Sequence, residues 1–150
     1  PGIDTEAKPV LHSTAFDQSG GMFSPNGRFF AYMTNESGKS EVYVQTFPIS
    51  ENKWPVSSGG GVLPLWREDG RELFYLTPDG RVMSVDVKTD GAFESGTPKQ
   101  LFQISLQHGS GIPYAVTPDG ARFLVEAPSE ETSNPFTVVL NWTARLKQTR

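Results

Sequence analysis

Two histidines, His12 and His108, are the side chains of this 150-residue chain best suited to acid–base or metal chemistry near neutral pH. His108 lies in the stretch QHGSG (107–111), where the hydroxyl of Ser110 is a candidate nucleophile. However, that serine lacks the G-x-S-x-G sequence of a nucleophile elbow, and no carboxylate motif completes a two-histidine metal site. We therefore predict no catalytic residue, no metal site and no cofactor, and expect His12 to pack within a strand.

The remaining motifs are incomplete in the same way. The triple glycine at 59–61 lacks the Lys-Ser/Thr pair of a phosphate-binding loop. The acidic stretch SEETSNP (129–135) does not have the spacing of a calcium-binding loop, so we expect a solvated turn there. The stretch NWT (141–143) matches a glycosylation acceptor, but it falls inside a predicted strand, where packing is the expected role.

Composition excludes several classes of protein. The chain has no cysteine, so disulfides and thiol chemistry are absent. A formal net charge of −4 and the lack of any Lys/Arg run argue against a nucleic-acid binder. No apolar stretch approaches the roughly 20 residues that a membrane span needs. The N-terminal PGIDTEAKPV (1–10) carries no targeting signal, and we expect a processed or excised segment.

Short apolar runs bounded by turn residues predict β-strands through most of the chain. Only the last dozen residues show a weak helical period. The consecutive apolar residues Leu73–Leu76 predict a strand buried on both faces. Three tryptophans, Trp54, Trp66 and Trp142, could stack on sugars or peptides, but their places in or beside strands favour packing between sheets. The predicted strands include RFFAYMTN, EVYVQTF, RELFYL, RVMSVDV, ARFLVEA and TVVLNW.

A repeat organises these strands. FSPNGRFFAYMTN (23–35), WREDGRELFYLTP (66–78) and VTPDGARFLVEAP (116–128) align around glycines that are 43 and 50 residues apart. Asn-Gly and Asp-Gly tolerate the positive φ of a tight hairpin, so each copy joins two antiparallel strands. A second hairpin follows in the same unit. The predicted structural turn residues are Asn26, Gly27, Asp69, Gly70, Asp79, Gly80, Asp119 and Gly120.

A period of 40–50 residues built from four short strands is typical of a propeller blade. We therefore predict an all-β fold of three four-stranded antiparallel propeller blades, half of a six-bladed propeller. The blades span about 15–58, 59–106 and 107–145 of the single segment 1–150, with an N-terminal closing strand at 8–14. The closing strand aligns with the last strand of the second unit, Leu11 over Leu101. An open β-sandwich with coincidental hairpins is the alternative.

The turn motifs carry a family resemblance. FSPNGR, WREDGRELFYL and VTPDGARFLV resemble the motif of TolB-like, WD-repeat-like β-propellers. Nearly the whole chain is similar to the C-terminal half of the propeller in bacterial membrane-anchored serine/threonine kinases. Asn26, Glu68 and the inserted Ala121 depart from the motif as turn variations. The resemblance implies an extracytoplasmic, periplasmic location, and it places the arginines after the turns at a blade edge (Arg28, Arg71 and Arg122).

Three blades alone would leave both end faces bare and strand edges unpaired. One solution is a homodimer in which two chains form a six-bladed ring and exchange their closing strands. The other is that further blades of a longer parent protein cover these faces.

Ligands of propellers usually bind at the channel mouth, on the connectors that lead into each inner strand. These connectors are polar and glycine-rich here, and our candidate ligand-binding residues are Asp17, Gln18, Ser58, Gly60, Gln107, His108 and Ser110. The predicted function is a non-catalytic binding or scaffold module that recognises a protein or peptide within a larger signalling protein. The alternatives are a substrate-gating propeller of a prolyl-oligopeptidase-like hydrolase and a carbohydrate-binding propeller.

Overall fold

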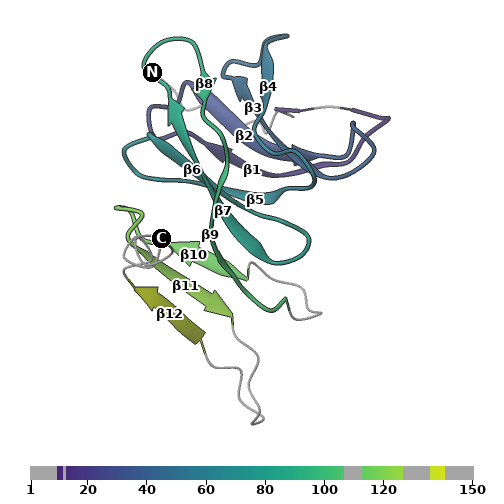
Figure 1. Ribbon diagram of the computed structural model, residues 1–150. Helices are drawn as coiled ribbons and strands as arrows, with labels where there is room; N and C mark the ends of the chain where they lie inside the picture. The colour runs from purple at the N-terminus through teal and green to yellow at the C-terminus, as the bar shows by residue number, and fades with distance from the viewer. Residues whose placement is uncertain (1–9, 12, 107–112, 127–135, 141–150) are drawn as a thin grey trace, which may run out of the picture.

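The computed structural model describes residues 10–11, 13–106, 113–126 and 136–140 (Figure 1). Within these ranges the chain forms three antiparallel sheets and no helix, so no helix there could span a membrane. The strands are β1 (Gln18–Phe23), β2 (Phe29–Thr34), β3 (Glu41–Thr46), β4 (Lys53–Pro55), β5 (Val62–Trp66), β6 (Glu72–Leu76), β7 (Arg81–Lys88), β8 (Glu94–Ser95), β9 (Lys99–Gln103), β10 (Tyr114–Val116), β11 (Arg122–Glu126) and β12 (Phe136–Leu140).

Each sheet follows chain order, as hairpin-connected strands do. The first sheet has the order β1-β2-β3-β4 and the third has β10-β11-β12. In the second sheet β5, β6 and β7 are followed by β9, which pairs with β7 beside the two-residue β8. The all-β prediction is confirmed, and the six quoted strands are present, the last of them over residues 137–140 because residues 141 and 142 lie outside the described ranges. The described residues of the predicted closing strand, Val10, Leu11, Ser13 and Thr14, form no strand within one chain.

Side-chain alternation on β6 explains how the sheets stack. All five of its residues are buried, as the apolar run 73–76 predicted. Leu73 and Tyr75 belong to the core shared with the first sheet. Phe74 and Leu76 belong to the core shared with the third sheet. The second sheet is therefore buried on both faces, and Figure 1 shows it between the other two.

The inner strands β1, β5 and β10 link neighbouring sheets through hydrogen bonds. The indole Nε1 of Trp66 donates to the carbonyl of Met22 at 3.2 Å, and the hydroxyl of Tyr114 donates to the carbonyl of Leu63 at 2.6 Å. A Cβ added at Gly20 would lie 3.9 Å from the Pro64 ring, and two residues further along each strand Met22 bonds Trp66, so β1 and β5 run side by side in the same direction. Three sheets joined in a row through their inner strands form part of a propeller and exclude the sandwich alternative.

The turn between the first two strands of each sheet is held by its own Asn or Asp. The side-chain oxygen of Asn26 accepts the amide of Arg28 at 3.1 Å, and Asp69 accepts the amide of Arg71 at 3.0 Å. Asp119 accepts the amide of Ala121 at 3.0 Å. In each case the side-chain oxygen accepts a hydrogen bond from the backbone amide two residues ahead, which is why Asn and Asp stabilise these turns.

Candidate functional site

The inner strands bring two sets of loops to opposite ends of the molecule. The connectors predicted to bind a ligand lead into β1 and β5, whereas the turns at Gly27 and Gly70 follow these strands. Because neighbouring inner strands run in the same direction, turns that are about 50 residues apart in the sequence lie next to each other. The amide of Glu68 in one turn donates to the carbonyl of Pro118 in the next at 3.0 Å.

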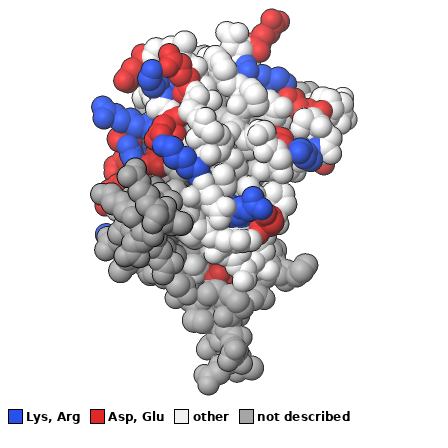
Figure 2. Space-filling model, in the orientation of Figure 1, with Lys and Arg blue, Asp and Glu red and all other residues white. Residues whose placement is uncertain are grey.

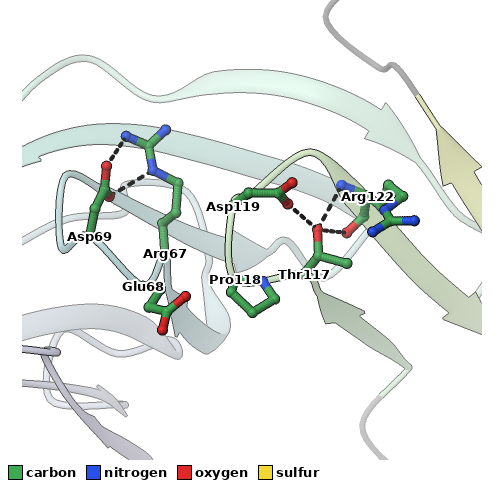
Figure 3. Close-up of a pocket in the computed structure, with 7 residues that line it drawn as sticks. All are labelled: Arg67, Glu68, Asp69, Thr117, Pro118, Asp119 and Arg122. Atoms are coloured by element: carbon green, nitrogen blue, oxygen red, sulfur yellow. Dashed lines mark hydrogen bonds and ion pairs between the residues drawn. The ribbon is translucent and has the colours of Figure 1, made fainter.

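A hollow of about 620 Å³ lies between these two turns (Figure 3). The β5–β6 turn provides one wall and the β10–β11 turn provides the other. Its lining residues are Arg67, Glu68, Asp69, Thr117, Pro118, Asp119 and Arg122.

A network of charged side chains fixes the first wall. Arg67 donates two hydrogen bonds to Asp69, from Nε at 2.7 Å and from NH2 at 2.8 Å, and a third to Glu72 at 2.7 Å. Glu72 is buried and also accepts a hydrogen bond from the hydroxyl of Ser84. The bonds with Arg67 hold the pKa of Asp69 below its ordinary value, and those with Asp69 raise the pKa of Arg67. Arg67 is therefore an oriented and permanently cationic part of the wall.

Hydrogen bonds of a threonine hydroxyl hold the second wall in place. Thr117 Oγ1 donates to the carboxylate of Asp119 and accepts the amide of Arg122 at 3.0 Å. This bond from Thr117 is the main reason that the pKa of Asp119 is lowered. The carboxylates of Asp69 and Asp119 are thus held in the ionised state at neutral pH.

Two charged side chains of the hollow, Glu68 and Arg122, are exposed and make no ion pair or side-chain hydrogen bond within the described residues. They come from different walls and carry opposite signs. The charge of Arg122 also helps to lower the pKa of Asp119 on the same wall. The opposite charges of Glu68 and Arg122 make the hollow better suited to a ligand that carries both charges than to a polyanion. On the face drawn in Figure 2, acidic and basic side chains are likewise interspersed rather than gathered by sign.

The predicted mouth residues are partly engaged in structural bonds. Asp17 exchanges hydrogen bonds with Asn35, through its amide at 2.9 Å and its carboxylate at 3.0 Å. The amide of Gly60 donates to buried Glu41 at 2.9 Å. Gln18 begins β1 and Ser58 is exposed in the β4–β5 connector. Gln107, His108 and Ser110 lie outside the described residues, as do His12 and residues 141–143.

The sequence did not lead us to Arg67, Glu68, Thr117 and Arg122 as a group. The available signal was the second turn, WREDG, which has two charged residues where the other turns have Ser-Pro and Thr-Pro. We interpreted that difference as a turn variation.

Arg28 and Trp66 have the packing roles that the sequence predicted for them. Arg28 donates to the carbonyls of Thr89, Asp90 and Gly91 at 3.2, 2.6 and 3.2 Å, which joins the β1–β2 turn of the first sheet to the loop after β7 of the second. Trp66 is buried between the first two sheets. Among the residues that the structure describes, no group of three or more His, Asp or Glu side chains is arranged to hold a metal ion.

Comparison with known proteins supports the fold but no family. No protein-family model and no curated protein matches the sequence. Among solved structures, TolB from Acinetobacter baumannii matches with a TM-score of 0.59 and 12% identity, over 83% of this chain and 30% of that one. An oligogalacturonate lyase from Vibrio parahaemolyticus matches with a TM-score of 0.53 and 14% identity, over 69% of this chain and 26% of that one.

A further structure, oligogalacturonate lyase in complex with manganese, has a TM-score of 0.50 and 16% identity, over 69% of this chain and 26% of that one. The chain thus spans less than a third of the length of each of these proteins. At these identities the similarity concerns the fold alone. The chain has the fold of part of a TolB-like β-propeller.

Proposed function

We propose that the chain is a non-catalytic propeller module that binds a protein or peptide segment in the hollow between the β5–β6 and β10–β11 turns. The observation that carries the proposal is the pair Glu68 and Arg122, two exposed opposite charges on walls that hydrogen bonds already fix. Pre-oriented walls lower the entropy lost on binding, and the two exposed charges supply specificity.

The direction of the pKa shifts supports binding rather than catalysis. A general acid or base works best when its pKa lies near the operating pH. In the hollow the pKa values of Asp69 and Asp119 are lowered and that of Arg67 is raised, so all three move away from neutrality. Burial likewise raises the pKa of Tyr114, which contacts the neighbouring sheet. These groups hold their charge state and are poorly suited to exchanging protons.

The proposal also covers where the module acts and which larger protein carries it. The similarity to TolB and the motif resemblance support an extracytoplasmic sensor or scaffold within a larger protein, such as a receptor-like kinase. A substrate-gating propeller beside a hydrolase domain is the enzymatic alternative. The two oligogalacturonate lyase matches favour a second candidate ligand, an acidic oligosaccharide whose carboxylates would pair with Arg122.

Binding measurements can decide between these ligands. Peptides would be selected from a random library on the immobilised chain, and their affinities measured by calorimetry beside a galacturonate trimer. We expect zwitterionic peptides to bind, and Arg122→Gln and Glu68→Gln each to weaken them about tenfold or more. A charge-assisted hydrogen bond contributes roughly 1.5–3 kcal/mol, and 1.4 kcal/mol is a factor of ten.

The matched control is Arg81→Gln, which removes a charge that is also exposed and that pairs with Asp79 of the β6–β7 turn. Peptide affinity that is insensitive to both hollow variants would contradict this site, and Gln18→Ala would then test the opposite mouth. Binding of the trimer but of no peptide would replace the peptide proposal with the oligosaccharide.

A further inference from the structure

The turn between β5 and β6 has a glutamate where three other turns of the chain have a proline. Glu68 aligns with Pro25, Pro78 and Pro118, each of which stands one residue before the Asn or Asp of its turn. All four turns have the same backbone closure, since the amide of each turn glycine donates to the carbonyl three residues before it at 2.8–2.9 Å. Proline is therefore compatible with the conformation of residue 68, and the glutamate adds a backbone N–H that the other turns lack.

This additional N–H joins the two walls of the hollow. The amide of Glu68 donates to the carbonyl of Pro118 in the β10–β11 turn, with 3.0 Å between nitrogen and oxygen. At the junction between the first two sheets the aligned residue is Pro25, whose ring carbon Cδ lies 3.7 Å from the place that a Cβ on Gly70 would occupy. The same position thus faces the next turn at both junctions, but of these two residues only Glu68 has a hydrogen to donate.

The side chain of the preceding residue crosses the same gap. The Cδ atom of Arg67 would lie 2.8 Å from a Cβ on Gly120, so the apolar stem of the arginine fits against the second wall because residue 120 has no side chain. Arg67 aligns with Ser24 and Thr117, whose hydroxyls bond within their own turns. Both departures of this turn from the repeat therefore add a contact between the walls of the hollow.

The first junction is held in a different way. Asn26 donates from Nδ2 to the carbonyl of Thr89 in the second sheet at 3.2 Å. Asp69 aligns with Asn26, but its ionised carboxylate has no hydrogen to donate across the second junction. The amide of Glu68 supplies a hydrogen bond at the junction where the aspartate cannot.

We propose that Glu68 is a positioning residue of the hollow, whose backbone amide holds the β5–β6 and β10–β11 walls at the separation that a bound peptide requires. The inference rests on the proposed function for its ligand and on the bond between Glu68 and Pro118 for its physical basis. Walls that are already joined lose less freedom when the ligand binds between Glu68 and Arg122. The side chain of Glu68 contacts the ligand, and its backbone prepares the site.

Two substitutions of the same residue separate these roles. Glu68→Gln removes the charge and keeps the N–H, whereas Glu68→Pro removes both and introduces the residue that the aligned turns contain. The ratio of the two affinities for one peptide therefore isolates the contribution of the amide. In calorimetry with a zwitterionic peptide selected on the unmodified chain, we expect Glu68→Pro to bind about twofold to tenfold more weakly than Glu68→Gln.

Urea unfolding shows whether both variants are equally well folded. We expect similar free energies of unfolding, because the lower entropy of an unfolded chain with a proline offsets the lost hydrogen bond. The matched control is Pro78→Gln, which exchanges the same two residue types in the β6–β7 turn, outside the hollow, and should leave peptide affinity unchanged.

Amide hydrogen exchange of the unmodified chain tests the bond without a ligand. We expect the N–H of Glu68 to exchange at least about tenfold more slowly than in an unstructured peptide. An unprotected Glu68 amide would overturn the proposal whatever the ligand is. Equal affinities of Glu68→Gln and Glu68→Pro for a peptide that binds the unmodified chain would overturn the positioning role alone. If no peptide binds the unmodified chain although the amide is protected, the proposed function fails, and the positioning role fails with it.

Discussion

Alanine substitutions at two turn glycines, Gly27 and Gly80, separate the cost of backbone conformation from the cost of lost space. Both residues have a positive φ, 68° and 84°. A Cβ on Gly27 would meet no atom within 4 Å, whereas a Cβ on Gly80 would lie 2.2 Å from the carbonyl oxygen of Ile104. The same substitution is therefore a conformational change at one site and a steric clash at the other.

The expected magnitudes follow from these distances. The left-handed conformation costs an alanine roughly 1–2 kcal/mol at either position. At Gly80 the backbone of Ile104 must also move, which costs about 1–3 kcal/mol as overpacking. That movement weakens the 2.8 Å hydrogen bond from the amide of Ile104 to the carbonyl of Gly80, which contributes about 0.5–1.5 kcal/mol. Gly80→Ala should thus lose about 2 kcal/mol more than Gly27→Ala.

Urea unfolding of both variants at one protein concentration gives the comparison. The effect of alanine on the entropy of the unfolded chain is nearly the same for both variants and cancels in the difference. Equal losses of unfolding free energy would refute the reasoning, because they would mean that the Ile104 carbonyl relaxes freely or that β9 does not lie against this turn.

Three further predictions concern the sheet junctions and the hollow. Tyr114→Phe should lower the free energy of unfolding by about 1–3 kcal/mol in urea titrations, because the carbonyl of Leu63 loses its buried donor. Leu73→Ala should cost about 2–5 kcal/mol by the same assay, since Leu73 is fully buried between two sheets. The hydrogen bond from Arg67 lowers the pKa of Asp69 in the folded state. The ionised carboxylate of Asp69 therefore stabilises the fold above its unfolded pKa of about 3.9. This stabilisation is lost as the pH falls through the lower, folded-state pKa. Asp69→Asn should therefore flatten the decline of the melting temperature below about pH 4.

The strands could be predicted because their signals are local. Leu73 to Leu76 are consecutively apolar, and only a strand between two sheets buries both faces of such a run. The Asx-Gly turns depend on bonds that span two residues, so the turn sequences alone predict them. Strand β8 was not predicted, because two exposed residues, Glu94 and Ser95, leave no apolar pattern.

The hollow could not be predicted in the same way, because its two walls are about 50 residues apart in the sequence. Glu68 and Pro118 meet through the stacking of β5 and β10, and no local pattern encodes that contact. The mouth prediction relied instead on loop composition. Composition shows that the connector at Gly60 is adaptable, but it does not show that Glu41 already binds its amide.

A comparison of the turns shows which one departs from the hydrogen-bond pattern that the others share. Three of them are closed by a hydroxyl that donates to the following Asn or Asp. Ser24 donates to Asn26 at 2.8 Å, Thr77 donates to Asp79 at 2.5 Å, and Thr117 bonds Asp119 in the same way. A hydroxyl is therefore sufficient to hold this kind of turn.

The second turn uses Arg67 where the others have a hydroxyl, and the change adds charge that the turn does not require. The guanidinium holds Asp69 in place, as a hydroxyl would, and it extends to the buried carboxylate of Glu72. The side chain of Arg67 is 26% exposed and that of Glu72 is 9% exposed, so the pair is only partly removed from water and contributes little net stability. The proposed binding role gives a second reason for an arginine here, because it sets an oriented cation beside the exposed Glu68 in the hollow.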